Sequence, residues 1–185
     1  MTRSPALEGV RRVHGARRSS AFGAASALLL ALLWTARARA DGYAVDGTLG
    51  VGSGMQAGDA GSGMAWSRAR LRLQTGFDLM SDELPNQAVG FRGFVELERR
   101  GSVGLEARYT RWLGRGFGGF VFGSAAFMPE TLVGGGVGFT LVIPLGSRVG
   151  LGLEPAFAAF PLGSDLPEGS FVFLAGLSAG VRVRL

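Results

Sequence analysis

The chain has 185 residues, 47% of them hydrophobic, with 32 Gly, no Cys, one His and a formal net charge of +5. This length predicts a single domain. The absence of Cys excludes disulfide frameworks, cysteine-ligated zinc and thiol nucleophiles, and since every basic residue is Arg, Walker-type phosphate loops and lysine Schiff bases are excluded as well.

Positive charge is concentrated in the first 40 residues, which contain seven Arg and a single acidic residue, Glu8. The remaining chain has 12 Arg and 13 acidic residues, so its composition does not support nucleic-acid binding. In the leader, a basic stretch ending at Arg18 precedes the apolar run Ala21–Trp34, and Ala38-Arg39-Ala40 forms a small-x-small cleavage site. We predict that residues 1–40 are a signal peptide, removed by cleavage before Asp41. An uncleaved membrane anchor is the alternative.

Residues 41–185 alternate with a period of two. In the last segment every odd position from Phe171 to Leu185 is apolar, whereas the even positions include Gly176, Ser178 and Arg182. This is the pattern of a strand with two unlike faces. Between breaks rich in Gly, Pro, Ser and Asp, the pattern predicts eight strands, at roughly 43–53, 65–77, 88–98, 102–112, 117–127, 131–143, 148–160 and 170–185. Ten strands would leave little room for loops.

Consecutive amphipathic strands without a helical stripe predict an all-β fold, an antiparallel up-and-down barrel. Alternation alone does not decide which face is inside, because a soluble barrel places apolar residues around a ligand and a membrane barrel turns them to lipid. Three features favour the membrane. The pattern continues to the last residue, aromatic residues gather toward the strand ends, and the alternate face carries few charges of mixed sign. We therefore predict a transmembrane β-barrel domain over residues 41–185.

The signal sequence, the eight amphipathic strands and the terminal strand Phe171–Leu185 together resemble the small outer-membrane β-barrels of the OmpA and OmpX type. The resemblance covers the architecture of residues 41–185. It implies a location in the bacterial outer membrane, contacts with membrane lipid and lipopolysaccharide, and insertion by the outer-membrane insertion machinery. We expect a monomer without a cofactor, a metal ion or a nucleic-acid partner.

One catalytic motif requires examination. The segment Gly176-Leu177-Ser178-Ala179-Gly180 spells the G-x-S-x-G nucleophile elbow, which requires a strand-turn-helix bend and a partner base. The segment lies inside the most regular predicted strand, and the single His of the chain, His14, is in the leader. We therefore expect that the protein is not an enzyme.

The function that these features favour is a structural or surface-interaction role for a barrel whose lumen is filled by side chains. Eight strands enclose a space only wide enough for side chains. Two alternatives stay open. The barrel would be a narrow small-solute channel if the many Gly leave a continuous water path, or an exported, soluble, lipocalin-like lipid-binding barrel if its cavity is apolar.

Charged residues on the strands are expected to face the lumen, because an Arg turned toward lipid near the midplane costs about 2–4 kcal/mol. For the second and third strands, a guessed register places Arg70 opposite Glu96 and Arg68 opposite Glu98. Arg182 and Arg184 would need acids such as Glu154 or Asp46. The predicted luminal network consists of Arg68, Arg70, Arg72, Glu96, Glu98, Glu106, Arg108, Glu154, Arg182 and Arg184.

An even number of strands places both termini at the periplasmic side. Gly54–Gly63 and Pro161–Gly169 then become outward loops, while Leu113–Gly116 and Pro144–Ser147 become short inner turns. The connection Asp78–Gln87 is long for an inner turn, which is the strongest objection to the strand count.

Overall fold

The structure, a computed structural model, describes residues 43–59, 64–68, 71–97, 101–127, 131–164 and 170–185. The predicted signal peptide, residues 1–40, lies outside the described residues. Over the described part, no helix has the length and apolar character needed to cross a bilayer. The strands there are β1 (Tyr43–Asp59), β2 (Met64–Arg68), β3 (Leu71–Ser81), β4 (Gln87–Leu97), β5 (Ser102–Gly114), β6 (Phe117–Phe127), β7 (Leu132–Pro144), β8 (Val149–Gly163) and β9 (Val172–Arg184).

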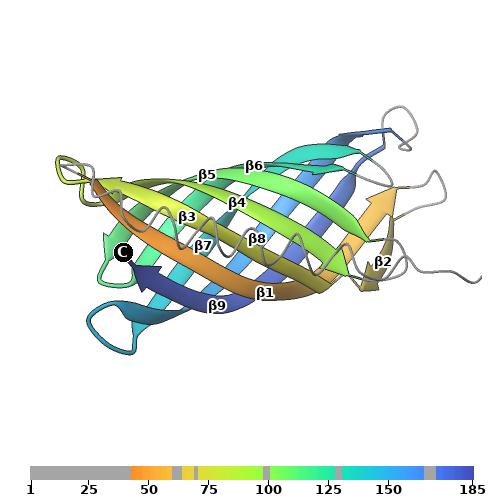
Figure 1. Cartoon of the computed structure of the whole chain (residues 1–185). Coiled ribbons are helices and arrows are strands. Elements are labelled where there is room, and N and C mark those ends of the chain that lie inside the picture. Colours follow the sequence, from red (N-terminus) through yellow and green to blue (C-terminus); the bar gives the residue numbers. More distant parts are fainter. Residues whose placement is uncertain (1–42, 60–63, 69–70, 98–100, 128–130, 165–169) are drawn as a thin grey trace, which may run out of the picture. The chain divides into compact units, whose positions relative to one another are not determined.

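These strands form one closed antiparallel sheet, because β1 pairs with β9 as well as with its neighbours in the chain (Figure 1). β3 pairs with Tyr43–Gly52 of β1, and β2 pairs with Met55–Asp59 of the same strand. β2 and β3 therefore lie end to end and together count as one of eight strands around the barrel. The predicted all-β, antiparallel, up-and-down barrel of eight strands is confirmed.

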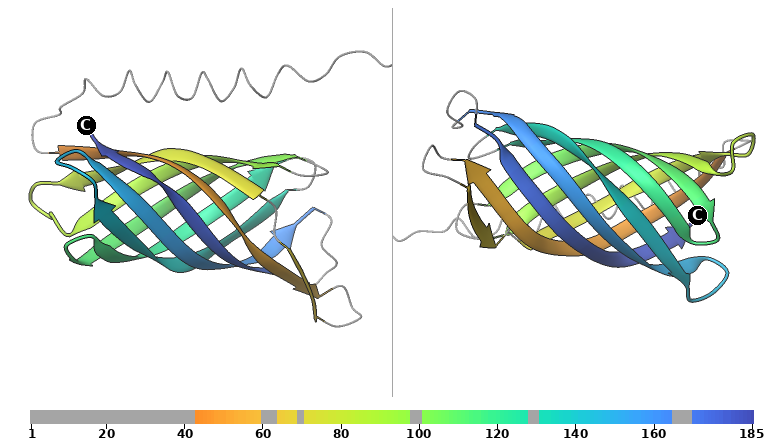
Figure 2. Two further views of the ribbon diagram at one scale, coloured as in Figure 1. Left: turned by 90° about the horizontal axis from the view of Figure 1, so that it is seen from below. Right: turned by 180° about the vertical axis from the view of Figure 1, so that it is seen from behind.

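The ends of the barrel differ in their connections. The turns 82–86, 115–116 and 145–148 lie at the end that also holds the start of β1 and the C-terminus, and we call this the turn end. The opposite end, where β1 and β8 finish, is called the loop end. Figure 2 shows the strands winding obliquely from one end to the other, with the C-terminus beside the start of β1.

Several strands run further than predicted, which corrects the assignment of their connections. β5 continues to Gly114, β7 to Pro144 and β8 to Gly163, so the first residues of the predicted connections Leu113–Gly116, Pro144–Ser147 and Pro161–Gly169 are strand. β1 continues through Gly54 to Asp59, so the first part of the predicted loop Gly54–Gly63 is strand. β3 likewise runs through Asp78 to Ser81, which leaves only residues 82–86 as a turn. Glycine weakens an isolated strand, but the ladder to β9 holds Gly54 opposite Gly176. The shorter turn removes the objection to eight strands.

The stagger of the strands can be measured from their pairing. A path along paired residues that starts at Asp46 of β1 passes once around the barrel and returns to β1 at Gln56, and 56 − 46 = 10 residues. The barrel thus combines eight strands with a shear of 10, and this combination fixes the strand tilt and the width of the lumen. The path passes through Asp78, Gly90, Arg108, Phe122, Gly136, Ala158 and Leu174.

The two faces of the sheet have opposite chemistry. On the inner face, charged side chains are almost completely covered, with Asp78 at 0% and Arg92 at 4% exposure. On the outer face, large apolar side chains are exposed on every long strand. Examples in strand order are Leu49, Leu73, Phe91, Leu105, Val121, Val137, Phe157 and Leu177. The strand alternation that is visible in the sequence therefore places charge inside the barrel and apolar surface outside.

Candidate functional site: the luminal ion network

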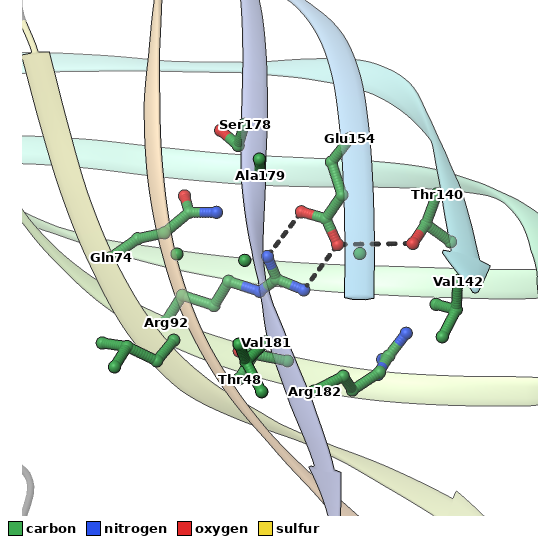
Figure 3. A pocket seen from close by; sticks show the side chains of 14 residues that line it. Thr48, Gln74, Arg92, Thr140, Val142, Glu154, Ser178, Ala179, Val181 and Arg182 are labelled. Carbon is green, nitrogen blue, oxygen red and sulfur yellow. Dashed lines mark hydrogen bonds and ion pairs between the residues drawn. The ribbon is translucent and has the colours of Figure 1, made fainter. Parts of the chain in front are cut away.

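The centre of the lumen is occupied by an ion pair between Arg92 of β4 and Glu154 of β8, on opposite sides of the barrel. The guanidinium binds the carboxylate through two hydrogen bonds, of 2.6 Å from Nη1 to Oε2 and 3.0 Å from Nη2 to Oε1. Thr140 donates to the same carboxylate over 3.4 Å, as Figure 3 shows, and Arg108 donates from Nη1 over 3.1 Å. Glu154 thus joins β4, β5 and β7 to β8.

Toward the loop end, the charges continue through β5 and β3. Arg108 holds Glu106 with an Nη2–Oε1 distance of 2.7 Å, and Glu106 lies 3.8 Å from Arg72. Arg72 in turn donates to Glu96 over 3.0 Å, and the hydroxyl of Ser102 donates to the other oxygen of Glu96 over 2.7 Å. Each charge on this side therefore contacts a neighbour of opposite sign.

Toward the turn end, the charges continue through Asp78 of β3. Arg92 Nη2 lies 3.6 Å from Asp78 Oδ2, and the same oxygen accepts a hydrogen bond from Arg182 of β9. Arg182 Nε is 3.4 Å from Asp46 of β1, and Arg184 Nε is 3.2 Å from the second oxygen of Asp46. Arg184 is the last residue of β9 and lies at the rim.

These contacts form a chain in which cations and anions alternate from one end of the lumen to the other. Five Arg and five acids take part, so their formal charges cancel. We call the set the luminal ion network. Its members, in order from the turn end, are Arg184, Asp46, Arg182, Asp78, Arg92, Glu154, Arg108, Glu106, Arg72 and Glu96.

Aromatic rings cover three of the guanidinium groups. The ring centre of Phe94 lies 3.8 Å from the guanidinium carbon of Arg72, and the ring centre of Phe120 lies 4.0 Å from the guanidinium carbon of Arg108. Trp112 lies 4.9 Å from that of Arg182, near the turn end. The rings fill space beside the charges and add cation–π attraction, which is stronger where water is excluded.

Glycine makes room for the network at one position in particular. Gly90 of β4 lies directly between Asp78 and Arg108 in the paired row, and a Cβ there would overlap Asp78 Oδ1. The absence of a side chain at Gly90 therefore allows the buried carboxylate to occupy the lumen between its two neighbouring strands.

Seven of the ten residues predicted from the sequence lie in this network: Arg72, Glu96, Glu106, Arg108, Glu154, Arg182 and Arg184. The predicted register is wrong by two residues, because Arg72 and not Arg70 is opposite Glu96. The longer β3 and the shorter turn 82–86 account for this shift. Arg70 and Glu98 lie outside the described residues. Glu154 binds Arg92 and Arg108, while acids from β1 and β3 bind Arg182.

The prediction that Arg68 and Arg72 share a face requires an unbroken alternation from one to the other. The pairing of β2 and β3 with β1 interrupts this alternation. Arg72 is opposite Gly52, whereas Arg68 is opposite Met55, so β1 has two residues where the partner has three. A register offset of one residue reverses the faces of a strand. The alternation therefore does not extend from Arg72 to Arg68, whose side chain lies outside the described part.

Two central members of the network, Asp78 and Arg92, were missing from the set predicted from the sequence. The predicted connection begins at Asp78 because Ser81 and Asp82 follow it, yet Asp78 itself sits between Phe77 and Leu79 in the same alternation. Arg92 shares the even positions of its strand with Glu96. The alternation places Arg92 on the inner face of the predicted strand 88–98, and it places Asp78 there once β3 is extended through the polar segment.

Two small cavities lie in the lumen among the described residues. A cavity of about 20 Å³ adjoins Arg92 and Arg182, and a second of about 50 Å³ lies near Arg72 and Phe122. Gln74, Glu154 and Ser178 line both cavities. A cavity needs roughly 10–15 Å³ to hold one water molecule, so the first cavity has room for about one water and the second for a few.

No protein-family model matches the chain, and the comparison with curated proteins gives no match. Similar solved structures include the following two. The solution NMR structure of de novo designed TMB2.3 gives a TM-score of 0.45 at 13% identity, covering 79% of this chain and 98% of that one. The crystal structure of Neisserial surface protein A (NspA) gives a TM-score of 0.45 at 14% identity, covering 78% and 98%, respectively. These comparisons assign no family, so the geometry of the barrel itself must support a function.

Proposed function

We propose that the protein is an integral outer-membrane β-barrel, not an enzyme, with a structural or surface-interaction role and a lumen filled by side chains. The observation that carries this proposal is the arrangement of the two faces, with apolar side chains outside on all the long strands and the luminal ion network inside. A soluble barrel needs the reverse arrangement.

The dimensions of the barrel support the same conclusion. An eleven-residue strand such as β4 is about 36 Å long, and at a tilt of about 45° it rises about 26 Å along the barrel axis. This height matches the apolar band of about 25 Å found on outer-membrane barrels. An exposed apolar surface of this extent in water would lead to association or aggregation.

The lipocalin-like alternative loses its support for the same reason. Lipid binding inside a soluble barrel requires an apolar cavity, and the described lumen instead has buried carboxylates and guanidinium groups along its length. The channel alternative is disfavoured by the two small cavities and by the central pair of Arg92 and Glu154, which fills the cross-section between β4 and β8.

The proposal that the protein is not an enzyme rests on the surroundings of Ser178. This residue of the G-x-S-x-G segment pairs with Gly52 on one side and Glu154 on the other, within regular ladders of β9. A nucleophile elbow requires a sharp bend at the Ser. Residues 41–185 contain no His to act as its base.

The partners that follow from this proposal are membrane lipid, lipopolysaccharide and the outer-membrane insertion machinery. The resemblance to OmpA- and OmpX-type barrels belongs to the same proposal, as do export by the signal peptide and a monomeric state. The apolar outer face supports the lipid contact. The near-neutral network inside provides no basis for binding nucleic acid.

The decisive experiment is envelope fractionation of the full chain, followed by gel migration of heated and unheated samples. We expect the protein in the outer-membrane fraction, with a heat-dependent shift in migration that marks a closed barrel. Val121→Asp, on the outer face of β6, should abolish the shift, whereas Ser147→Asp in a turn should preserve it. Recovery of folded protein from the soluble fraction without detergent would overturn the proposal.

Conductance distinguishes a filled lumen from a channel. The purified full chain, incorporated into a planar bilayer, should give no steady ion current above the background of the bilayer. Stable single-channel steps that depend on protein concentration would establish the channel alternative instead.

A further inference from the structure

One strand pairing in the barrel has no connection to fix it. Consecutive strands are joined by the chain, and short turns limit how far they can slip against each other. β1 and β9 are the first and last strands, so no loop joins them, although they share thirteen paired positions. Their register determines the shear of the barrel and thereby its tilt and width.

The side chains along this seam specify the register only weakly. On the inner face between Thr48 and Gln56, Gly50 is opposite Gly180, Gly52 opposite Ser178 and Gly54 opposite Gly176, so in this stretch no group larger than a serine hydroxymethyl meets its partner. On the outer face, the pairs Leu49–Val181 and Val51–Ala179 are apolar and point away from the lumen. A slip of two residues keeps every side chain on its own face and would again place apolar groups opposite apolar groups.

Charge is the feature that distinguishes the registers. Arg182 is the buried cation of β9, with 7% of its surface exposed, and it reaches acids on two other strands, Asp46 of β1 and Asp78 of β3. The ring of Trp112 from β5 covers the same guanidinium. Arg182 therefore links β9 to β1 and β3, at a depth where Asp78 has no exposure to water.

The two possible slips differ in what they do to Arg182. If Arg182 moved to the position opposite Asp46, the shear would be 8, and Arg182 would enter the row of Asp46 and Asp78 and take the place of Arg184. If Arg182 moved to the position opposite Gly50, the shear would be 12, and the guanidinium would lie among glycines beside Arg92. This second slip moves Arg182 by about 6.6 Å along the strand, away from both acids.

We propose that Arg182 is the positioning residue that, by binding Asp78 and Asp46, prevents the closing register of the barrel from slipping to a shear of 12. A buried ion pair need not add to stability, but fixing a register is the best-attested use of buried polar groups. This inference concerns how the barrel closes and holds for a structural barrel and a channel alike.

Cysteine pairs on the outer face of the seam can report the register directly, since the chain has no Cys of its own. Val51→Cys with Ala179→Cys reports the native register. Val51→Cys with Leu177→Cys reports the slip to a shear of 8, and Val51→Cys with Val181→Cys reports the slip to 12. The full chain would be purified, folded in detergent and oxidised, and the yield of each cross-link measured on a gel.

In the protein without further substitutions, we expect the cross-link yield of the native pair to exceed that of either slipped pair by about tenfold or more. A tenfold ratio of the two registers corresponds to about 1.4 kcal/mol. In Arg182→Gln and in Asp78→Asn, the yield of the pair Val51→Cys with Val181→Cys should rise several-fold. Arg182→Lys keeps the cation beside both acids and should keep the native pattern. Arg72→Gln removes a largely covered luminal cation at the loop end and serves as the control that leaves the pattern unchanged.

An unchanged cross-linking pattern in folded Arg182→Gln would overturn the proposal. If Arg182→Gln gives no folded barrel, Asp78→Asn decides, because it removes the carboxylate and leaves Arg182 in place. A several-fold rise of the cross-link between positions 51 and 181 in that variant supports the proposal, and an unchanged pattern overturns it.

Discussion

Glu154 connects more strands than any other single acid described in the lumen. It accepts hydrogen bonds from Arg92, Arg108 and Thr140, which lie on three different strands. Charges buried among side chains are stable only when they are paired, because transfer from water costs several kcal/mol per ion. The stability of the network therefore depends on each partner being present.

A double-mutant cycle on Arg92→Met and Glu154→Gln tests this dependence. Each single substitution should lower the free energy of unfolding by about 3–5 kcal/mol, because it leaves the other charge buried without its main partner. The double variant should lose less than the sum of the two. The measurement is unfolding by denaturant in detergent or lipid, and additive losses would mean that the two residues act independently.

Gly90 and Gly123 form a matched pair for testing the close packing around Asp78. Gly90→Ala places a Cβ against Asp78 Oδ1 and should lower the free energy of unfolding by about 1–3 kcal/mol, the usual cost of overpacking. Gly123→Ala adds the same group where no atom lies within 4 Å, and it should change stability by less than about 0.5 kcal/mol. Equal losses at both positions would point to backbone effects instead of packing at Asp78.

At the scale of the elements, strand length determines which residues are connections. β1 spans 17 residues and β8 spans 15, whereas β4 and β6 span 11 each, so the loop end is uneven. The turn end is compact. Residues 115–116 join β5 to β6, where Gly116 adopts a φ of 80°, a conformation that favours glycine.

The difference between the ends leads to a prediction about orientation in the membrane. Outer-membrane barrels have short periplasmic turns and longer external loops, so the turn end should face the periplasm. A membrane-impermeant thiol reagent should label Asp59→Cys in intact cells, while Ser147→Cys should react only after the envelope is opened. Labelling of Ser147→Cys alone in intact cells would reverse the assigned topology.

Processing of the leader is a second prediction at this scale. The small-x-small site Ala38-Arg39-Ala40 should direct cleavage before Asp41. N-terminal sequencing of the exported protein should therefore begin with Asp41-Gly42-Tyr43. A mature protein that retains Met1 or the apolar run would show that the leader acts as an anchor.

At the scale of the whole molecule, the shear of 10 predicts the tilt of the strands. Eight strands with a shear of 8 tilt by about 36°, and a larger shear tilts them further. We expect a tilt of about 40–45° from the barrel axis, near the upper limit for membrane barrels. Polarised infrared spectroscopy of the protein in oriented bilayers measures this angle. A value close to that of a shear of 8 would contradict the register of β1 with β9.

The sequence by itself determined the architecture of the barrel. The period-two pattern gave the strand number, and the boundaries of β6 at Phe117 and Phe127 were predicted to the residue. The alternation of Glu106 and Arg108 with apolar neighbours also placed them on one face. Such inferences succeed because the repeat of a strand is local, so each side chain's face follows from its immediate neighbours.

Only the tertiary structure decided which charges meet. Arg182 and Asp78 are 104 residues apart in the chain, and their contact depends on the closing register of β1 with β9, which no local pattern contains. The pairing of Arg72 with Glu96 depended likewise on the true length of the turn 82–86. A slip by two residues leaves every face unchanged, so the pattern in the sequence cannot distinguish these registers, and only the complete set of contacts across a closed barrel does.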